Sequence, residues 1–418
     1  MFQKIFKNAF YLSLASSLSK IFYLIQAMLI ARFLGVEGYG LYSFAFAFAG
    51  VFFAFADLGT YNFGLREISR KKSALTKYAA GMLLIEIASC SIAFLALLIF
   101  SLILKTGALP LIAGIVLLIG VIQSAFSIGF YARQRMIVPA AVSTLQSAAT
   151  LALSAVFIHL GLGVSYLLLS FLISKVIAAL ILIAYFRKAF GKLNFKTDFT
   201  FLINIFKKSF PFLINGIVFS LLFNIGMLMF RFMKGDYAFG IYSAANKVVE
   251  NLSFLPASLI SAAYPAFSSF FGAKKRISRA YTKIFNSLIL MCSFIIIILV
   301  IFARQIIQIV FSNKFLDAVP VLRILSFTFL TSALISMNLS FLNAVNKTKV
   351  NIAISVSLIP IYALSAFFLI KNYNYIGFAV SILLIEIVFL IAQQLFIRKN
   401  NKESRSKTRT KERSFLHN

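Results

Sequence analysis

The feature that most constrains this chain is a series of apolar segments, each about 20 residues or longer, recurring along its length. A helix of about 20 residues spans the roughly 30 Å hydrocarbon core of a bilayer. Hydrophobic residues make up 61% of the chain and charged residues 12%, whereas soluble domains average about 45–50% and 25%. We therefore expect an all-α integral membrane protein, with helices rather than a barrel crossing the membrane.

Twelve spans are expected, with both termini in the cytoplasm. They lie near 9–31, 41–63, 79–104, 111–132, 139–160, 165–186, 209–231, 239–264, 284–303, 319–344, 350–370 and 376–397. Of the 41 lysines and arginines, 30 fall in the segments on the expected inner side and seven on the outer side. This asymmetry follows the positive-inside rule. It places the protein in the cytoplasmic membrane and removes nucleic acid as the explanation of the +30 charge.

A short sequence motif occurs twice, about 200 residues apart. The stretch R-F-L-G-V-E-G-Y-G-L-Y-S at 32–43 is echoed by R-F-M-K-G-D-Y-A-F-G-I-Y-S at 231–243, with one residue inserted between the acid and the following glycine. Duplicated halves are typical of transporters whose substrate path lies between the repeats. We expect two pseudo-repeated six-helix lobes at 1–190 and 209–397, with a basic cytoplasmic linker at 191–208 between them. A basic, disordered tail at 398–418 is expected to anchor orientation, or to bind anionic membrane lipids or a cytoplasmic partner.

Several function classes are not supported by the residues. No phosphate-binding loop is present, because Leu193 follows Gly191 and Lys192 where Ser or Thr is required. The longest expected outer loop, near 304–318, holds one acid, Asp317. We therefore expect no enzyme and no catalytic residues. The two cysteines lie within spans and the two histidines are far apart in sequence, so no disulfide, metal site or cofactor is expected.

Charges inside the spans are the candidate working parts. They are Lys20, Asp57, Glu86, Lys175, Lys247, Glu250, Arg323 and Glu386. Each would cost about 2.5–3.5 kcal/mol facing lipid at mid-bilayer, so most should face a wet cavity, pair or snorkel. The first two spans of each half, which are spans one, two, seven and eight, carry polar side chains at helical spacing. We therefore place the cavity between these four spans. The cavity candidates are Lys20, Asp57, Asn224, Asn246, Lys247 and Glu250.

Simpler explanations compete with a role in the cavity. Lys20 could pair with Asp57 or another acid on a neighbouring helix, and Lys247 could pair with Glu250 three residues later. Asp57 and Glu86 could act in packing or in ion coupling.

Three further positions leave similar alternatives. Arg323 could snorkel to the outer surface, and Lys175 and Glu386 could face the cavity or each other. Pro256 and Pro265 would kink or end the eighth span as a hinge, or could simply be tolerated there.

The first-loop phrase at 32–42 resembles the signature of the polysaccharide transporter family, the Wzx-like oligosaccharide flippases of the multidrug/oligosaccharidyl-lipid/polysaccharide exporter superfamily. Its signature positions here are Arg32, Gly35, Glu37, Gly40 and Tyr42. Weaker likenesses follow in the family's order at 57–59, 66–68, 132–136, 256–265 and 343–349.

This resemblance implies two lobes facing each other in a V-shaped cleft, with spans one, two, seven and eight lining it. It also implies alternating access that carries an undecaprenyl-diphosphate-linked oligosaccharide from the inner to the outer leaflet. A cationic cavity would receive the diphosphate, with Lys20 the best match and Lys247 next. Coupling to protons or sodium would need a carboxylate such as Asp57, Glu86 or Glu250. The alternatives are a cation-coupled drug or metabolite antiporter of the same superfamily, or a membrane glycan polymerase or ligase.

Overall fold

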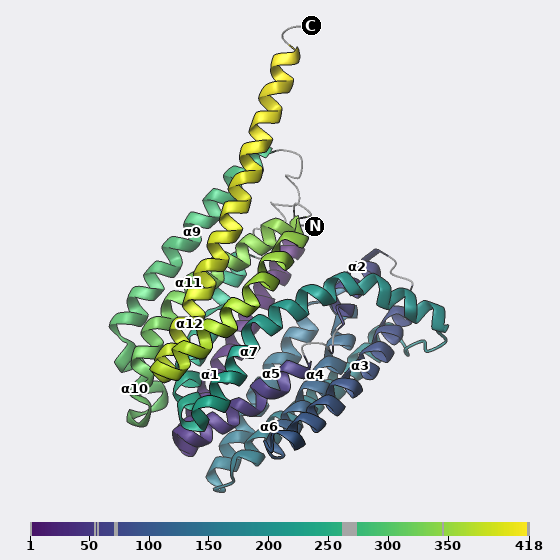
Figure 1. Ribbon diagram of the computed structural model, residues 1–418. Coiled ribbons are helices and arrows are strands. Elements are labelled where there is room, and N and C mark those ends of the chain that lie inside the picture. Colours follow the sequence, from purple (N-terminus) through teal and green to yellow (C-terminus); the bar gives the residue numbers. More distant parts are fainter. Residues whose placement is uncertain are drawn as a thin grey trace.

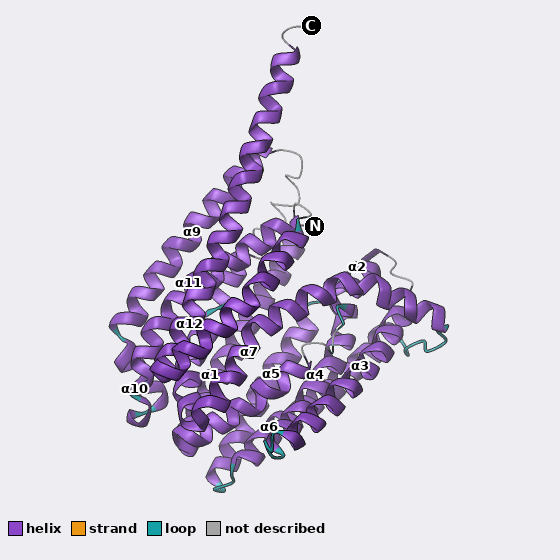
Figure 2. Cartoon of the chain, in the orientation of Figure 1, coloured by secondary structure: helices purple, strands orange, loops and turns teal. Residues whose placement is uncertain are grey.

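The computed structural model describes residues 2–53, 56, 58–70, 74–260, 274–344 and 347–415, which are helical with short connections and contain no β-strand (Figure 2). The first half holds α1 (Phe2–Phe53), α2 (Thr60–Arg70), α3 (Leu75–Ile103), α4 (Leu109–Ala132), α5 (Ile137–His159) and α6 (Val164–Phe190). The second half holds α7 (Phe199–Leu252), α9 (Lys274–Ile301), α10 (Ala303–Phe311), the 3-10 turn η2 (Asn313–Phe315), α11 (Ala318–Ala344) and α12 (Thr348–Phe415).

The expected twelve crossings are present because three helices turn back on themselves. Helices α1, α7 and α12 contain one non-helical residue each, Gly35, Gly235 and Asn374. Eight described helices are long and apolar enough to span a membrane, and two of them, at 39 and 49 residues, are long enough for two crossings. Counting these two twice gives ten crossings among the described helices, and α7, which has 54 residues and a kink at Gly235, adds two more, so that each half has six.

The two lobes meet at one end and diverge toward the end that carries the N terminus (Figure 1). We call these the kink end and the termini end. Buried apolar residues follow this arrangement. One large core around the kinks joins both halves, with Phe44 of α1 and Phe239 of α7 among its members. Two smaller cores serve the lobes separately, one around Phe126 and Phe186 in the first half and one around Leu288 in the second.

Helix α7 starts earlier than expected and lies on the first lobe. Of the expected linker only residues 191–198 form a loop, because α7 begins at Phe199. Phe201 packs against Tyr78 of α3 with ring centroids 5.2 Å apart, and Ile205 is buried in the core of the first lobe. The first turns of α7 therefore tie the second half to the termini end of the first.

Two span boundaries differ from expectation. The second span ends at Phe53 rather than near 63, and α2 follows as a separate helix. Leu58 and Gly59 between them have left-handed φ values of 48° and 71°, which a helix does not accommodate. The eighth span is also broken, at Ser253, and is helical again over 254–260, the last residues that the structure describes before 274. Pro256 follows one turn later, where its missing N–H leaves a helical carbonyl unpaired.

The expected outer loop near 304–318 is structured. It contains α10 and η2, which pack at the kink end. At the other extreme, α12 continues past the last expected span to Phe415.

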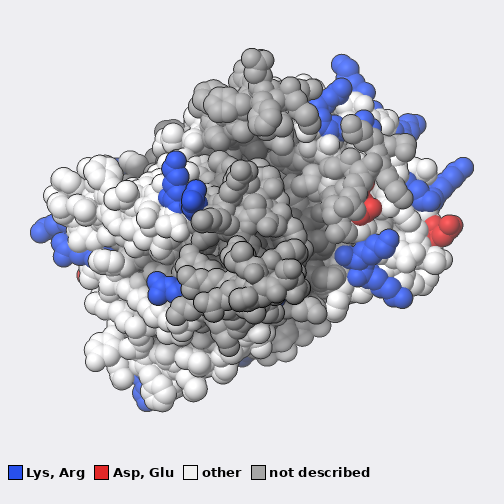
Figure 3. Space-filling view, turned by 90° about the horizontal axis from the view of Figure 1, so that it is seen from above, with Lys and Arg blue, Asp and Glu red and all other residues white. Residues whose placement is uncertain are grey.

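Basic side chains gather at the termini end. Figure 3, which views that end, shows Lys and Arg on both lobes and few acidic groups. The exposed Lys192 and Lys208 belong to this set, whereas the kink end carries few cations. By the positive-inside rule, this is the end that is expected to face the cytoplasm.

A labelling experiment tests the orientation. Cysteine placed at Lys192 should react with a membrane-impermeant maleimide only from the cytoplasmic side, and cysteine at the exposed His159 only from outside. The native Cys90 and Cys292 are buried and serve as the unreactive background. Labelling of the His159 position from the cytoplasm would reverse the proposed topology.

Candidate functional site

Both halves repeat the same backbone kink. Gly35 in α1 and Gly235 in α7 adopt φ of 71° and 78° with ψ of −173° and −174°, a conformation open chiefly to glycine. They stand 200 residues apart, as do Tyr42 and Tyr242. The extra residue of the second half therefore lies between Arg231 and Gly235. The expectation that it lies between Asp236 and Gly240 was wrong.

Beyond the kinks the two helices cross with their backbones in contact. A Cβ on Gly40 would collide with the carbonyl oxygen of Asp236, and one on Gly240 with that of Val36. These pairs are also separated by 200 residues, so the contact is symmetric. Small residues that let helix backbones approach are a principal source of association between membrane helices. The crossing joins the lobes at the kink end.

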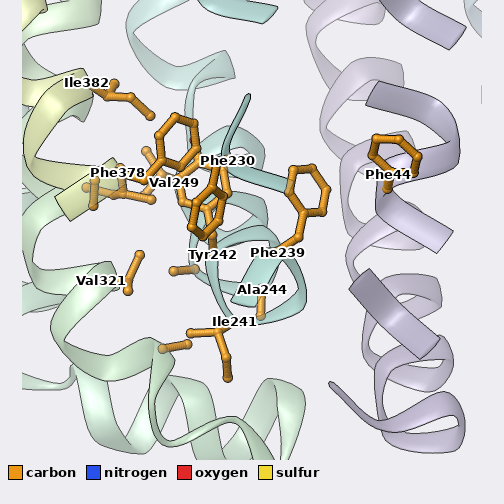
Figure 4. Close-up of a cluster of buried hydrophobic side chains, with 14 of the residues drawn as sticks. Phe44, Phe230, Phe239, Ile241, Tyr242, Ala244, Val249, Val321, Phe378 and Ile382 are labelled. Atoms are coloured by element: carbon orange, nitrogen blue, oxygen red, sulfur yellow. The ribbon is translucent and has the colours of Figure 1, made fainter. Parts of the chain in front are cut away.

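Aromatic rings fill the space around the crossing. Phe44 of α1 faces Phe239 of α7 (Figure 4), with ring centroids 6.1 Å apart. Arg231 bonds both carboxylate oxygens of Asp236 at 2.9 Å, and its guanidinium lies 4.5 Å from the centre of the Phe44 ring. A paired guanidinium can rest on an aromatic face with little remaining charge exposed.

A second set of contacts reaches α10 and η2. Arg32 donates a hydrogen bond to the backbone carbonyl of Ile309. Tyr39 packs against Phe311 and Phe315 with centroid distances of 5.8 and 6.0 Å. The signature residues Arg32, Gly35 and Gly40 thus shape the closure of the kink end, whereas Glu37 is exposed.

A cavity of about 560 Å³ lies beside this closure. It is lined by α1, by Phe171 of α6 and by α7, and we call it the central cavity. Tyr39, Tyr42, Phe239 and Tyr242, from the crossing region, form part of its wall. Its volume falls within the roughly 300–1,000 Å³ common for small-molecule sites.

A second cavity of about 280 Å³ lies inside the second lobe, between α7, α11 and α12. It shares Asn246 and Glu250 with the central cavity. Glu386 lines it and is nearly fully buried; Thr331 and Ser332 donate hydrogen bonds to its two oxygens, the latter at 2.6 Å. We call it the second-lobe cavity.

The structure places some of the residues predicted to line the cavity there and others elsewhere. Asn246, Lys247 and Glu250 line the central cavity, while Asn224 lines neither cavity and Asp57 lies outside the described residues. Lys20 is half-buried on α1. It is not a cavity-lining residue, but it stands one turn from Tyr23 toward the termini end.

The structure decides several alternatives left by the sequence. Lys247 pairs with Glu250 at 3.1 Å. Lys175 packs against Gly120 within the first lobe while Glu386 lies in the second, so these two charges do not face each other.

Two other charges inside the spans also have defined surroundings. Arg323 is exposed on α11. The buried Glu86 accepts a 2.6 Å hydrogen bond from Thr60 at the start of α2.

Sequence reasoning missed the hydroxyl partners of Glu386 and the aromatic lining of the central cavity. Adjacent Thr331 and Ser332 in an apolar span were the available signal for the first. Among the described residues no group of three or more His, Cys, Asp or Glu is placed to hold a metal ion.

A family model described as polysaccharide biosynthesis protein matches residues 5–271. The chain belongs to this family. No curated protein matches the chain.

Solved structures share the fold. An inward-facing multidrug resistance MATE family transporter of the MOP superfamily superposes with a TM-score of 0.72 at 14% identity, covering 92% of this chain and 96% of that one. The lipid II flippase MurJ in its inward closed conformation superposes with a TM-score of 0.70 at 15% identity, covering 93% of this chain and 87% of that one. A MOP superfamily transporter from Pyrococcus furiosus, described by the reverse polarity of its binding pocket, superposes with a TM-score of 0.68 at 16% identity. The match covers 95% of this chain and 96% of that one.

The crossing of this family member can be tested by adding one methyl group. Gly40→Ala or Gly240→Ala should destabilise the purified protein by about 1–3 kcal/mol, because a Cβ must displace an opposing backbone. Gly50→Ala, on the same helix with nothing within 4 Å of the added Cβ, is the matched control. Thermal unfolding in detergent measures the effect. An unchanged midpoint for Gly40→Ala would contradict the close crossing.

Proposed function

We propose that this protein is a flippase that moves a polyprenyl-diphosphate-linked oligosaccharide from the inner to the outer leaflet of the cytoplasmic membrane, for surface polysaccharide biosynthesis. The observation that carries the proposal is the central cavity, which lies between the lobes and beside the glycine crossing. Helices α1 and α7, which begin the two halves, both line it, and the lobes diverge on the side of the cavity that faces the termini end. Family membership and the fold shared with the flippase MurJ support the same function.

The geometry suits a lipid with a large polar headgroup. Such a headgroup needs a hydrated route, whereas its polyprenyl tail must stay in hydrocarbon. Lobes that diverge on one side provide both, because the tail can remain outside while the headgroup enters between them. A diphosphate carries about two negative charges and needs a cation in surroundings of low dielectric.

Lys20 is the cation we assign to the diphosphate. It shares a helix face with Tyr23 and Ala27, which line the central cavity, and lies about 4.5 Å along the axis from Tyr23 toward the termini end. Lys247 is the weaker choice because Glu250 already pairs with it.

Transport can be measured with the purified protein in liposomes. Lys20→Ala should slow the movement of a polyprenyl-diphosphate-linked oligosaccharide at least about tenfold, since charge-assisted hydrogen bonds are worth about 1.5–3 kcal/mol. Lys20→Arg should retain part of the rate. Lys188→Ala, an exposed cation at the same end, is the control.

Three outcomes would count against this assignment. Full activity of Lys20→Ala would move the diphosphate site elsewhere. Export of a drug with no lipid movement would favour the antiporter, and a lengthened or transferred glycan would indicate an enzyme.

Coupling to a proton or sodium gradient would use the second-lobe cavity, where Glu250 and Glu386 offer carboxylates. A carboxylate held by two hydroxyls inside the membrane is costly to keep charged without a counter-ion. Transport should therefore proceed without ATP and slow when ionophores collapse both gradients. Glu386→Gln should remove this gradient dependence while the protein still folds; retention of the dependence would place coupling at another carboxylate.

A further inference from the structure

The two faces of the central cavity differ in a way that the duplication makes visible. At corresponding positions 200 residues apart, the first half has Phe46 and Ala47 where the second has Asn246 and Lys247, and all four line the cavity. At these two positions the first-half wall is apolar and the second-half wall is polar; Gln26 and Ser43 add polar groups elsewhere on the first-half wall.

The first-half wall carries a continuous run of rings, one of which, Phe171, comes from α6. Tyr23 and Phe171 stack nearly parallel with centroids 5.8 Å apart, Phe171 meets Phe46 at 5.3 Å, and Phe46 meets Tyr42 at 5.5 Å. Flat aromatic faces suit the C–H faces of a pyranose ring, and hydroxyl and amide groups suit its hydroxyls. Ser243 and Asn246 supply such groups on the opposite wall.

The polar wall carries no net charge. Lys247 and Glu250 are the two Lys, Arg, Asp or Glu residues lining the central cavity, and they pair at 3.1 Å. The adjoining second-lobe cavity adds Glu386 and, among the residues lining it, no cation. An anionic ligand would therefore meet a neutral chamber bordered by carboxylates.

We propose that the central cavity is a subsite for an uncharged glycosyl unit, and that Glu250 is the residue that discriminates against acidic sugars. This rests on the proposed flippase function and refines it. The diphosphate stays at the level of Lys20, while the sugars reach the aromatic wall and the paired Lys247 and Glu250. Neutralisation of Lys247 by Glu250 removes the one cation that could receive a uronic acid inside the cavity.

The experiment compares two lipids that share one polyprenyl diphosphate, one bearing a neutral disaccharide and the other a disaccharide with a hexuronic acid. The reconstituted wild-type protein should move the neutral lipid at least about tenfold faster, because a carboxylate that enters the cavity loses hydration and finds no unpaired cation there to compensate. Glu250→Gln should lower this ratio severalfold by freeing the charge of Lys247. Lys247→Gln should raise it.

Two variants separate charge from structural damage. The double variant Lys247→Gln/Glu250→Gln keeps the chamber neutral and should keep the wild-type ratio. Asp198→Asn, at an exposed acid in the loop before α7 and outside both cavities, should leave both rates unchanged.

The outcomes distinguish the two proposals. Equal wild-type rates for both lipids, or a ratio unchanged by Glu250→Gln, would overturn the inference and leave the flippase function standing. A wild-type protein that moves neither lipid would overturn the flippase function, and the inference with it.

Discussion

The backbone contact of Gly40 with Gly240 is the constraint on which the rest of this structure depends. Lipid tails are as apolar as leucine, so apolar side chains alone give two membrane helices little reason to associate. Close backbone approach supplies dispersion contacts that lipid cannot replace, and neither helix has a Cβ at the crossing to prevent it. The kinks at Gly35 and Gly235 aim both helices at this point. The shared core surrounds it, and the central cavity lies next to it.

The two halves share a symmetric backbone arrangement, but the side-chain contacts around it differ between them. The kinks and crossing glycines correspond, yet the polar contacts around them do not. Arg32 reaches across to α10, whereas Arg231 closes on Asp236 of its own helix. Backbone geometry leaves little tolerance for substitution at the crossing. Side chains one or two turns further along α1 and α7 face open volume, where a change of chemistry does not disturb the frame.

How far the sequence predicts this molecule depends on whether the relevant signal is local. Span number, duplication and the helices lining the cavity were predicted, because apolar length and helical phase are properties of single segments. The end of the second span was wrong because left-handed Leu58 and Gly59 are a local break that hydropathy averages over. The hydroxyl partners of Glu386 were not predictable, since Thr331 and Ser332 lie 55 and 54 residues away in sequence and meet it only after α11 and α12 pack.

The same crossing also limits how the lobes can move. Bulky side chains interlocked at a helix contact must repack when the crossing angle changes, because protein interiors are closely packed. Two glycine backbones present no side chains to interlock, so the angle can change with little repacking at that point. A contact further from it, such as that of Arg32 with Ile309, has a longer lever arm and would separate in the proposed transport cycle. The glycine pair is thus suited to act as a pivot, and the contact of Arg32 with Ile309 as a latch.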